Sequence, residues 1–129
     1  MKKNEIHVFF ELPSKECNFR SLKKQTRFIQ QSCNADELTF FKLLFEGLDF
    51  LESIENLELT VDHVKRMKNS AQMMKSEVTQ MDNSHETAQI MLEDLLKKID
   101  ESIDKDEVTF AIADVIDCIA LILDSFCVT

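Results

Sequence analysis

The sequence predicts a mainly α-helical fold, an antiparallel bundle of four to five helices with a short N-terminal strand or extended arm. Apolar residues recur at spacings of three and four over most of the chain, which is the period of a helix with one buried face. One glycine and one proline among 129 residues leave few sites for tight turns and hairpins. A chain of this length buries a core without staples, so we expect a single domain over residues 1–129.

The first thirteen residues are expected to be extended. Apolar side chains alternate from Ile6 to Leu12, a pattern typical of a half-buried strand, and Pro13 ends the run. Because a lone strand leaves backbone groups unpaired, residues 1–13 must either pack on the helices or pair with another chain, as in a homodimer.

A basic helix is predicted over residues 18–32, beginning after Asn18. Residues 1–33 contain seven Lys or Arg against three Glu, whereas the rest of the chain contains eight against twenty-one Asp or Glu. The apolar face of this helix consists of Phe19, Leu22, Thr26 and Ile29.

Residues 36–126 are expected to form a four-helix core. Its first helix runs from Asp36, a good N-cap residue, to Glu58. Gly47 costs this helix about 1 kcal/mol relative to Ala, and either lets another helix approach closely or is a tolerated defect. The apolar seam consists of Leu38, Phe41, Leu44, Phe45, Leu48, Leu51, Ile54 and Leu57, and the acidic outer face of Glu46, Asp49, Glu52, Glu55 and Glu58.

The next helix begins at Thr60 or Asp62 and carries methionines seven residues apart, namely Met67, Met74 and Met81, with Met73 beside them. Methionine suits an adaptable binding surface, but it more often fills an irregular core, and we favour the core. The following helix is expected to begin at Asn83, which has the spacing of a capping box with Glu86.

The last helix is predicted over residues 106–126 and is apolar almost all the way round. Such a helix must be covered by other helices or by a partner. Its polar side is a narrow acidic stripe, which is either solvated or receives Lys or Arg from the basic helix or from a partner. This stripe consists of Asp114, Asp117 and Asp124.

Composition and spacing exclude several functions. The net charge of -9 disfavours nucleic acid and membrane surfaces as partners, and no apolar run is long enough to span a bilayer. The four cysteines lack metal-site spacing and no signal region precedes them, so we expect a cytoplasmic protein without disulfides. The Glu-x-x-His pairs of di-metal bundles are missing, and the best metal candidate, His85 with Asp82 and Glu86, is explained by capping. We therefore expect no catalytic residue, no metal and no cofactor.

Two segments resemble a known family. The run from Leu44 to Leu51, Leu-Phe-Glu-Gly-Leu-Asp-Phe-Leu, and the run from Asp106 to Leu123 are similar to segments of small helical proteins encoded in flagellar gene clusters of Gram-positive bacteria. The resemblance covers fewer than half the residues. It implies a cytoplasmic accessory protein of flagellar assembly, similar in kind to helical chaperones that hold export substrates.

Two functions follow as hypotheses. In the first, the chain is a protein-binding module whose apolar groove covers an amphipathic helix of a partner. The walls of that groove are expected to be Phe41, Phe45, Leu48, Ile116, Ile119 and Leu123. In the alternative, it is an acidic inhibitor, such as an immunity protein, antitoxin or phage-encoded blocker, that meets a basic effector through its acidic outer face. The residues of that face are Glu46, Asp49, Glu52 and Glu55. A di-metal bundle protein is a distant third.

Overall fold

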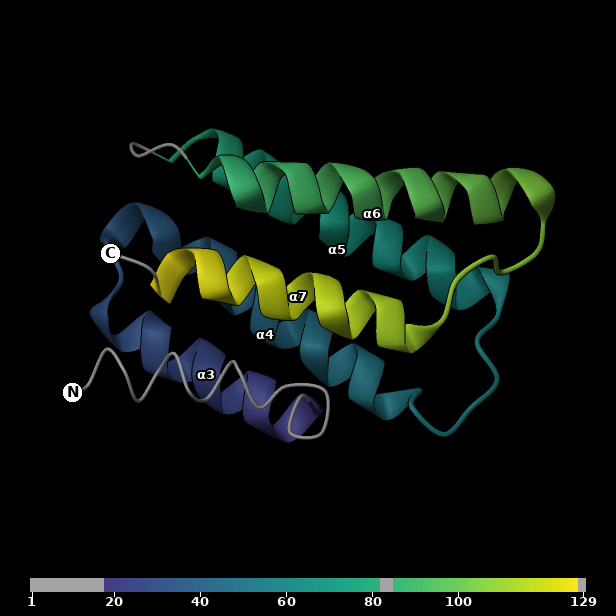
Figure 1. Ribbon diagram of the computed structural model, residues 1–129, viewed down its shortest axis with the longest axis horizontal. Coiled ribbons are helices and arrows are strands. Elements are labelled where there is room, and N and C mark those ends of the chain that lie inside the picture. The colour runs from purple at the N-terminus through teal and green to yellow at the C-terminus, as the bar shows by residue number, and fades with distance from the viewer. Residues whose placement is uncertain (1–17, 82–84, 128–129) are drawn as a thin grey trace.

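The chain folds as a bundle of helices around one core. The computed structural model describes residues 18–81 and 85–127, and this part of the chain forms five α-helices and one 3-10 turn, with no strand (Figure 1). The elements are α3 (Phe19–Ser32), the 3-10 turn η1 (Ala35–Glu37), α4 (Leu38–Ser53), α5 (Val61–Thr79), α6 (Glu86–Lys105) and α7 (Ile112–Cys127). The predicted mainly α-helical class is therefore confirmed. The strand or arm predicted over residues 1–13 lies outside the described residues.

Successive helices run in opposite directions, and each packs against the next. The helices α6, α7 and α3 form the near layer in Figure 1, with α5 and α4 behind them. Helix α3 also contacts α7, so the first and last described helices lie side by side. These two helices run in the same direction (Figure 1). This contact closes the bundle, so every described helix has a neighbour on two sides.

The core is built from the predicted helical seams. Aromatic rings gather where α4 begins and α7 ends: the Phe126 ring centroid lies 5.3 Å from that of Phe40 and 4.9 Å from that of Phe41. Edge-to-face and offset pairs of this kind add about 0.5–1.5 kcal/mol to the burial of the rings. The methionine stripe joins the core as expected, since Met67, Met74 and Met81 are buried, and Met73 alone of the group is exposed.

Two helices begin where the sequence predicts, and in each the residue before the helix caps it. The side-chain oxygen of Asn18 accepts the Ser21 N–H at 2.9 Å, and the Ser21 hydroxyl accepts the Asn18 N–H at 3.2 Å. Thr60 caps α5 in the same way, with His63 as the reciprocal residue. These bonds satisfy N–H groups that have no partner inside a helix.

The helix predicted over 36–58 is shorter at both ends. The carboxylate of Glu37 accepts the Asn34 N–H at 3.0 Å, which stabilises the 3-10 turn η1, so α4 begins at Leu38 rather than at Asp36. At the other end α4 stops at Ser53. Ile54 stays buried while Leu57 turns outward, because the chain must reverse before α5.

The last helix also begins later than predicted. Helix α6 continues to Lys105, and Asp106 then adopts a left-handed conformation with φ of 52°. The Asp106 N–H bonds the Ile103 carbonyl and the Glu107 N–H bonds the Ser102 carbonyl, the two bonds of a Schellman motif. Residues 107–111 connect α6 to α7, so the helix predicted over 106–126 covers Ile112–Cys127 as α7.

Two further predictions concern the start of α6 and the role of Gly47. Helix α6 begins at Glu86, later than the predicted start at Asn83, which lies outside the described residues. A Cβ built on Gly47 would have no other atom within 4 Å, so close helix approach does not explain the glycine and the tolerated-defect interpretation stands. Among the described residues, no helix combines the length and apolarity needed to cross a membrane.

Candidate functional site: a groove between α6 and α7

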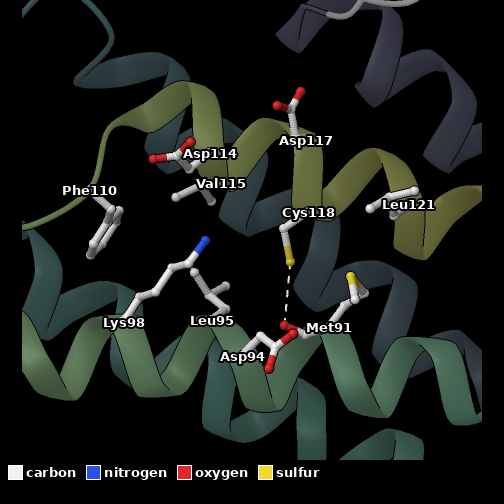
Figure 2. A pocket seen from close by; sticks show the side chains of 10 residues that line it. All are labelled: Met91, Asp94, Leu95, Lys98, Phe110, Asp114, Val115, Asp117, Cys118 and Leu121. Atoms are coloured by element: carbon white, nitrogen blue, oxygen red, sulfur yellow. Dashed lines mark hydrogen bonds between the residues drawn. The ribbon is translucent and has the colours of Figure 1, made fainter.

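A groove of about 240 Å³ lies between α6 and α7 (Figure 2). Its residues come from one face of each helix and from the connection between them, which contributes Phe110. They are Met91, Asp94, Leu95, Lys98, Phe110, Asp114, Val115, Asp117, Cys118 and Leu121.

The floor of the groove is apolar. Leu95 and Val115 are buried beneath it, and Cys118 projects from α7 toward α6. The Cys118 thiol donates a hydrogen bond to the Met91 carbonyl oxygen at 3.4 Å, which links the two walls. Because the cysteine side chain is small, it leaves the space above the thiol, between the two helices, unfilled.

The Cys118 thiol is not a nucleophile at neutral pH. Its pKa is raised to about 11, mainly by burial, while Lys98 lowers the pKa and Asp94 raises it by smaller amounts. The thiolate is the reactive form of cysteine, so this side chain remains a neutral thiol and acts as part of the apolar floor.

The rim of the groove is acidic. Asp94 stands on the α6 wall, while Asp114 and Asp117 stand on the α7 wall (Figure 2). Lys98 extends from α6 with its ammonium directed toward α7, yet within the described part of the chain it forms no ion pair with any of the three. The Asp114 carboxylate also stabilises the start of α7, because it accepts a hydrogen bond from the Ala111 N–H at 3.0 Å.

Apolar side chains stand at both ends of the groove. Phe110 is half-buried at one end, and at the other Met91 is half-buried while Leu121 is 52% exposed. An exposed leucine beside an apolar floor loses contact with water when a partner covers it, which is favourable. The groove therefore has the apolar centre and polar rim of a small protein interface.

No family model, no curated protein and no solved structure matches this chain. The residues of the groove bring together apolar surface, exposed carboxylates and one lysine.

The residues predicted to form the apolar walls are distributed differently. Phe41, Leu48, Ile119 and Leu123 are at most 4% exposed and form part of the core. The chain covers these seams with its own helices, so in this fold they do not line an open groove. Two of the predicted wall residues, Phe45 and Ile116, are half-buried.

Phe45 is covered by the basic helix. The Arg27 guanidinium lies 4.4 Å from the centroid of the Phe45 ring, and the Lys23 ammonium lies 5.3 Å from it. Cations in these positions are attracted by the electrons of the ring face. This contact places Phe45 in the packing of α3 on α4, away from the α6 and α7 groove.

The predicted acidic face on α4 is exposed and partly paired within the chain. Lys23 of α3 contacts the carboxylate of Asp49 and lies 2.9 Å from that of Glu52. Hydrogen bonds to these two carboxylates raise the pKa of Lys23. The basic helix therefore pairs with α4, whereas among the described residues no ion pair reaches the acidic stripe of α7. Glu46 is exposed on the same face of α4.

His85, the centre of the best metal candidate, contacts other residues instead. Its ring stacks on Phe126 with centroids 4.3 Å apart, and its Nε2 lies 3.2 Å from a carboxylate oxygen of Glu37. This nitrogen is buried and has no hydrogen-bond partner among the described residues. Asp82 lies outside the described residues, and within 18–81 and 85–127 no three His, Cys, Asp or Glu side chains are placed to hold a metal ion.

Sequence reasoning missed most of the groove residues. A signal for Leu121 is the pattern of the last helix, which is apolar almost all the way round and so has more apolar residues than one buried face can hold. Nothing in the spacing of Met91 shows that it would remain partly uncovered. Asp94 and Lys98 look like ordinary exposed residues until the two helices are placed side by side.

Proposed function

We propose that this chain is a non-catalytic protein-binding module that covers an amphipathic helix of a partner protein in the groove between α6 and α7. The observation that carries the proposal is the half-open apolar floor of the groove, with Leu121 exposed at its edge. A partner helix of this kind buries its apolar stripe in a groove of the same character.

The size of the groove favours side chains over a separate small molecule. Pockets for drug-sized ligands hold about 300–1,000 Å³ and bury most of the ligand surface. The groove holds about 240 Å³ and is open to solvent along the two helices. It is therefore better suited to one or two apolar side chains that project from a partner helix.

The biological setting is proposed from the flagellar resemblance. We propose a cytoplasmic accessory of flagellar assembly, similar in kind to chaperones that hold export substrates. Apolar surfaces of such a substrate would be covered until export, and the groove supplies a surface of the right chemistry for that task.

The experiment tests whether a flagellar export substrate binds the chain and whether it binds in the groove. Purified flagellar export substrates of the organism that encodes the chain are mixed with it, and complexes are detected by size-exclusion chromatography. We expect one substrate to co-elute, and Leu121→Arg to weaken the complex about tenfold or more, as the loss of an apolar anchor does. Ile90→Arg is the matched control, since Ile90 is 51% exposed on α6 and does not line the groove.

Two results would contradict the proposal. Co-elution that is equally strong for the wild type, Leu121→Arg and Ile90→Arg would remove the groove from the interaction. Absence of a complex with every flagellar substrate would remove the flagellar assignment.

The acidic inhibitor has less structural support. Lys23 already pairs with two of its four predicted contact residues, Asp49 and Glu52, and this leaves Glu46 and Glu55 without an ion pair among the described residues. Binding through a charged face weakens steeply with added salt, whereas apolar burial does not. Strong salt dependence together with insensitivity to Leu121→Arg would favour the inhibitor.

A further inference from the structure

We infer that the partner helix carries Lys or Arg on both sides of its apolar anchor, and that Asp94 and Asp117 select for these basic residues. The inference rests on the proposed function, since it concerns the occupant of the same groove. It is carried by the position of two exposed carboxylates, those of Asp94 on α6 and Asp117 on α7, at the rim of the apolar floor.

Of the nine carboxylates of α6 and α7, four have an ion pair or a hydrogen bond with another described residue. On α6, Glu93 pairs with Lys75, Asp100 with Lys68, and Glu101 with Lys105. On α7, the Asp114 carboxylate accepts a backbone N–H. These carboxylates have structural contacts that account for their positions.

Asp94 and Asp117 differ from this group. Both are exposed, both line the groove, and neither forms an ion pair or hydrogen bond with any described residue. They stand on opposite walls, and Cys118, which directly follows Asp117 in the sequence, lies between them in Figure 2. An apolar side chain seated over Cys118 would therefore have a carboxylate available on either flank.

Because of Lys98, the two ends of the groove differ in charge. The Lys98 ammonium lies toward the end marked by Phe110, away from the Leu121 end (Figure 2). Asp114 stands on the α7 wall near the same end, so that end already has charges of both signs. The charge order of the groove thus fits a helix whose basic residues lie at its middle, close to Asp94 and Asp117.

The experiment uses three designed peptides of about 18 residues, long enough for a helix of roughly 27 Å. All three carry the same leucine stripe, and the residues that flank it are Lys, Glu or Gln. Affinities are measured by fluorescence anisotropy at low salt, and the site of binding is mapped by amide chemical shifts in NMR spectra of the full chain.

We expect the Lys peptide to bind roughly three- to tenfold more tightly than the Gln peptide, which is what two exposed ion pairs contribute. The Glu peptide should bind most weakly, and the shifts should be confined to α6 and α7. The double variant Asp94→Asn, Asp117→Asn should lose the preference for Lys while still binding the Gln peptide. The matched control, Glu46→Gln with Glu55→Gln, removes the same charge from α4 and from the turn that follows it, and should retain the preference.

The outcomes separate this inference from the proposed function. If all three peptides bind in the groove with equal affinity, charge selection is wrong and the helix-binding function stands. If none of the peptides shifts a groove residue, both are wrong. A preference for Lys that survives in the Asp94, Asp117 variant and disappears in the α4 control would place the selection on α4 and overturn the inference.

Discussion

Cys118 is the residue whose size and chemistry most affect the groove. A larger side chain at this position would fill the space between Met91 and Leu95, and a charged one would give the floor a polar group. The thiol is small and nearly apolar, and its hydrogen bond to the Met91 carbonyl oxygen satisfies it. Its character depends on burial, which is a property of the folded chain.

The first prediction concerns the reactivity of this thiol. With the other cysteines replaced by serine, alkylation of Cys118 by iodoacetamide should be slow at neutral pH and should rise with a midpoint near pH 11, because burial raises its pKa to about 11. Urea-unfolded protein, in which the thiol has its ordinary pKa, is the control. A midpoint below pH 9 in the folded protein would contradict the buried position.

The same pKa has a consequence for stability. A pKa raised on folding from 9.0 to about 11 means that the folded state favours the neutral thiol. The stabilisation is fully present below about pH 9 and is lost as the pH rises toward about 11. Cys118→Ala should remove this part of the alkaline destabilisation, as measured by urea denaturation across that range.

A further prediction about a single residue concerns Gly47. A methyl group at this position meets no atom within 4 Å, so Gly47→Ala gains helix propensity without a clash. We expect the free energy of unfolding to rise by about 0.5–1 kcal/mol in urea denaturation. A decrease in that free energy would show that the glycine is needed for a reason that the packing does not reveal.

At the scale of elements, the end of α6 shows how the chain makes a sharp turn with only one glycine. Asp106 takes the left-handed conformation that glycine usually provides, and the two bonds of the Schellman motif hold it there. The hydroxyl of Ser102, which is buried, then accepts the Thr109 N–H at 3.0 Å and fixes the connection to α7. These contacts determine where the groove ends and where Phe110 is placed.

The prediction at this scale is that Asp106→Gly stabilises the protein. Glycine adopts positive φ without strain, so the free energy of unfolding should rise by roughly 0.5–1 kcal/mol. Asp104→Gly is the matched control, because Asp104 is exposed within α6 and a glycine there should cost about 1 kcal/mol. Thermal or urea unfolding of the two variants measures the difference, and equal effects would contradict the role given to Asp106.

At the scale of the whole molecule, the contact of α3 with α7 closes the bundle and determines which surfaces remain available. The predicted need of the last helix for cover is met largely by α6 and α3, and by the phenylalanines of α4 that contact Phe126. Val115, Ile119, Ile122 and Leu123 are buried as a result. What remains uncovered is the edge of α7 that faces the α6 groove, with Leu121 upon it. The proposed function therefore concerns a narrower surface than the apolar pattern of the helix indicates.

The corresponding prediction is that Ile119→Ala lowers the free energy of unfolding by about 2–5 kcal/mol, the cost of emptying a packed site. Such a loss is a large share of a total stability of about 5–15 kcal/mol. Ile90→Ala is the control, since Ile90 is 51% exposed and its removal should change stability little. Similar losses in both variants, measured by urea denaturation, would contradict the buried position of Ile119.

The sequence by itself determined the helical class, the apolar seams and two of the helix starts. These properties are local: a repeat of three and four residues selects the buried face of a helix, and Asn18 and Thr60 cap the N–H groups of the turn that follows them. Helix ends were less predictable. The turn at Glu37 and the left-handed Asp106 depend on where the next helix must go.

Only the tertiary structure decided which apolar surface is covered by the chain itself. Phe41 and Ile119 carry the same helical pattern whether a helix of this chain or one of a partner packs against them, so their burial was not visible in the sequence. The groove likewise depends on tertiary packing. Asp94 and Asp117 line the same groove only because α6 and α7 lie side by side. The physical reason is that periodicity specifies which side of a helix is apolar, whereas packing in three dimensions specifies what that side touches.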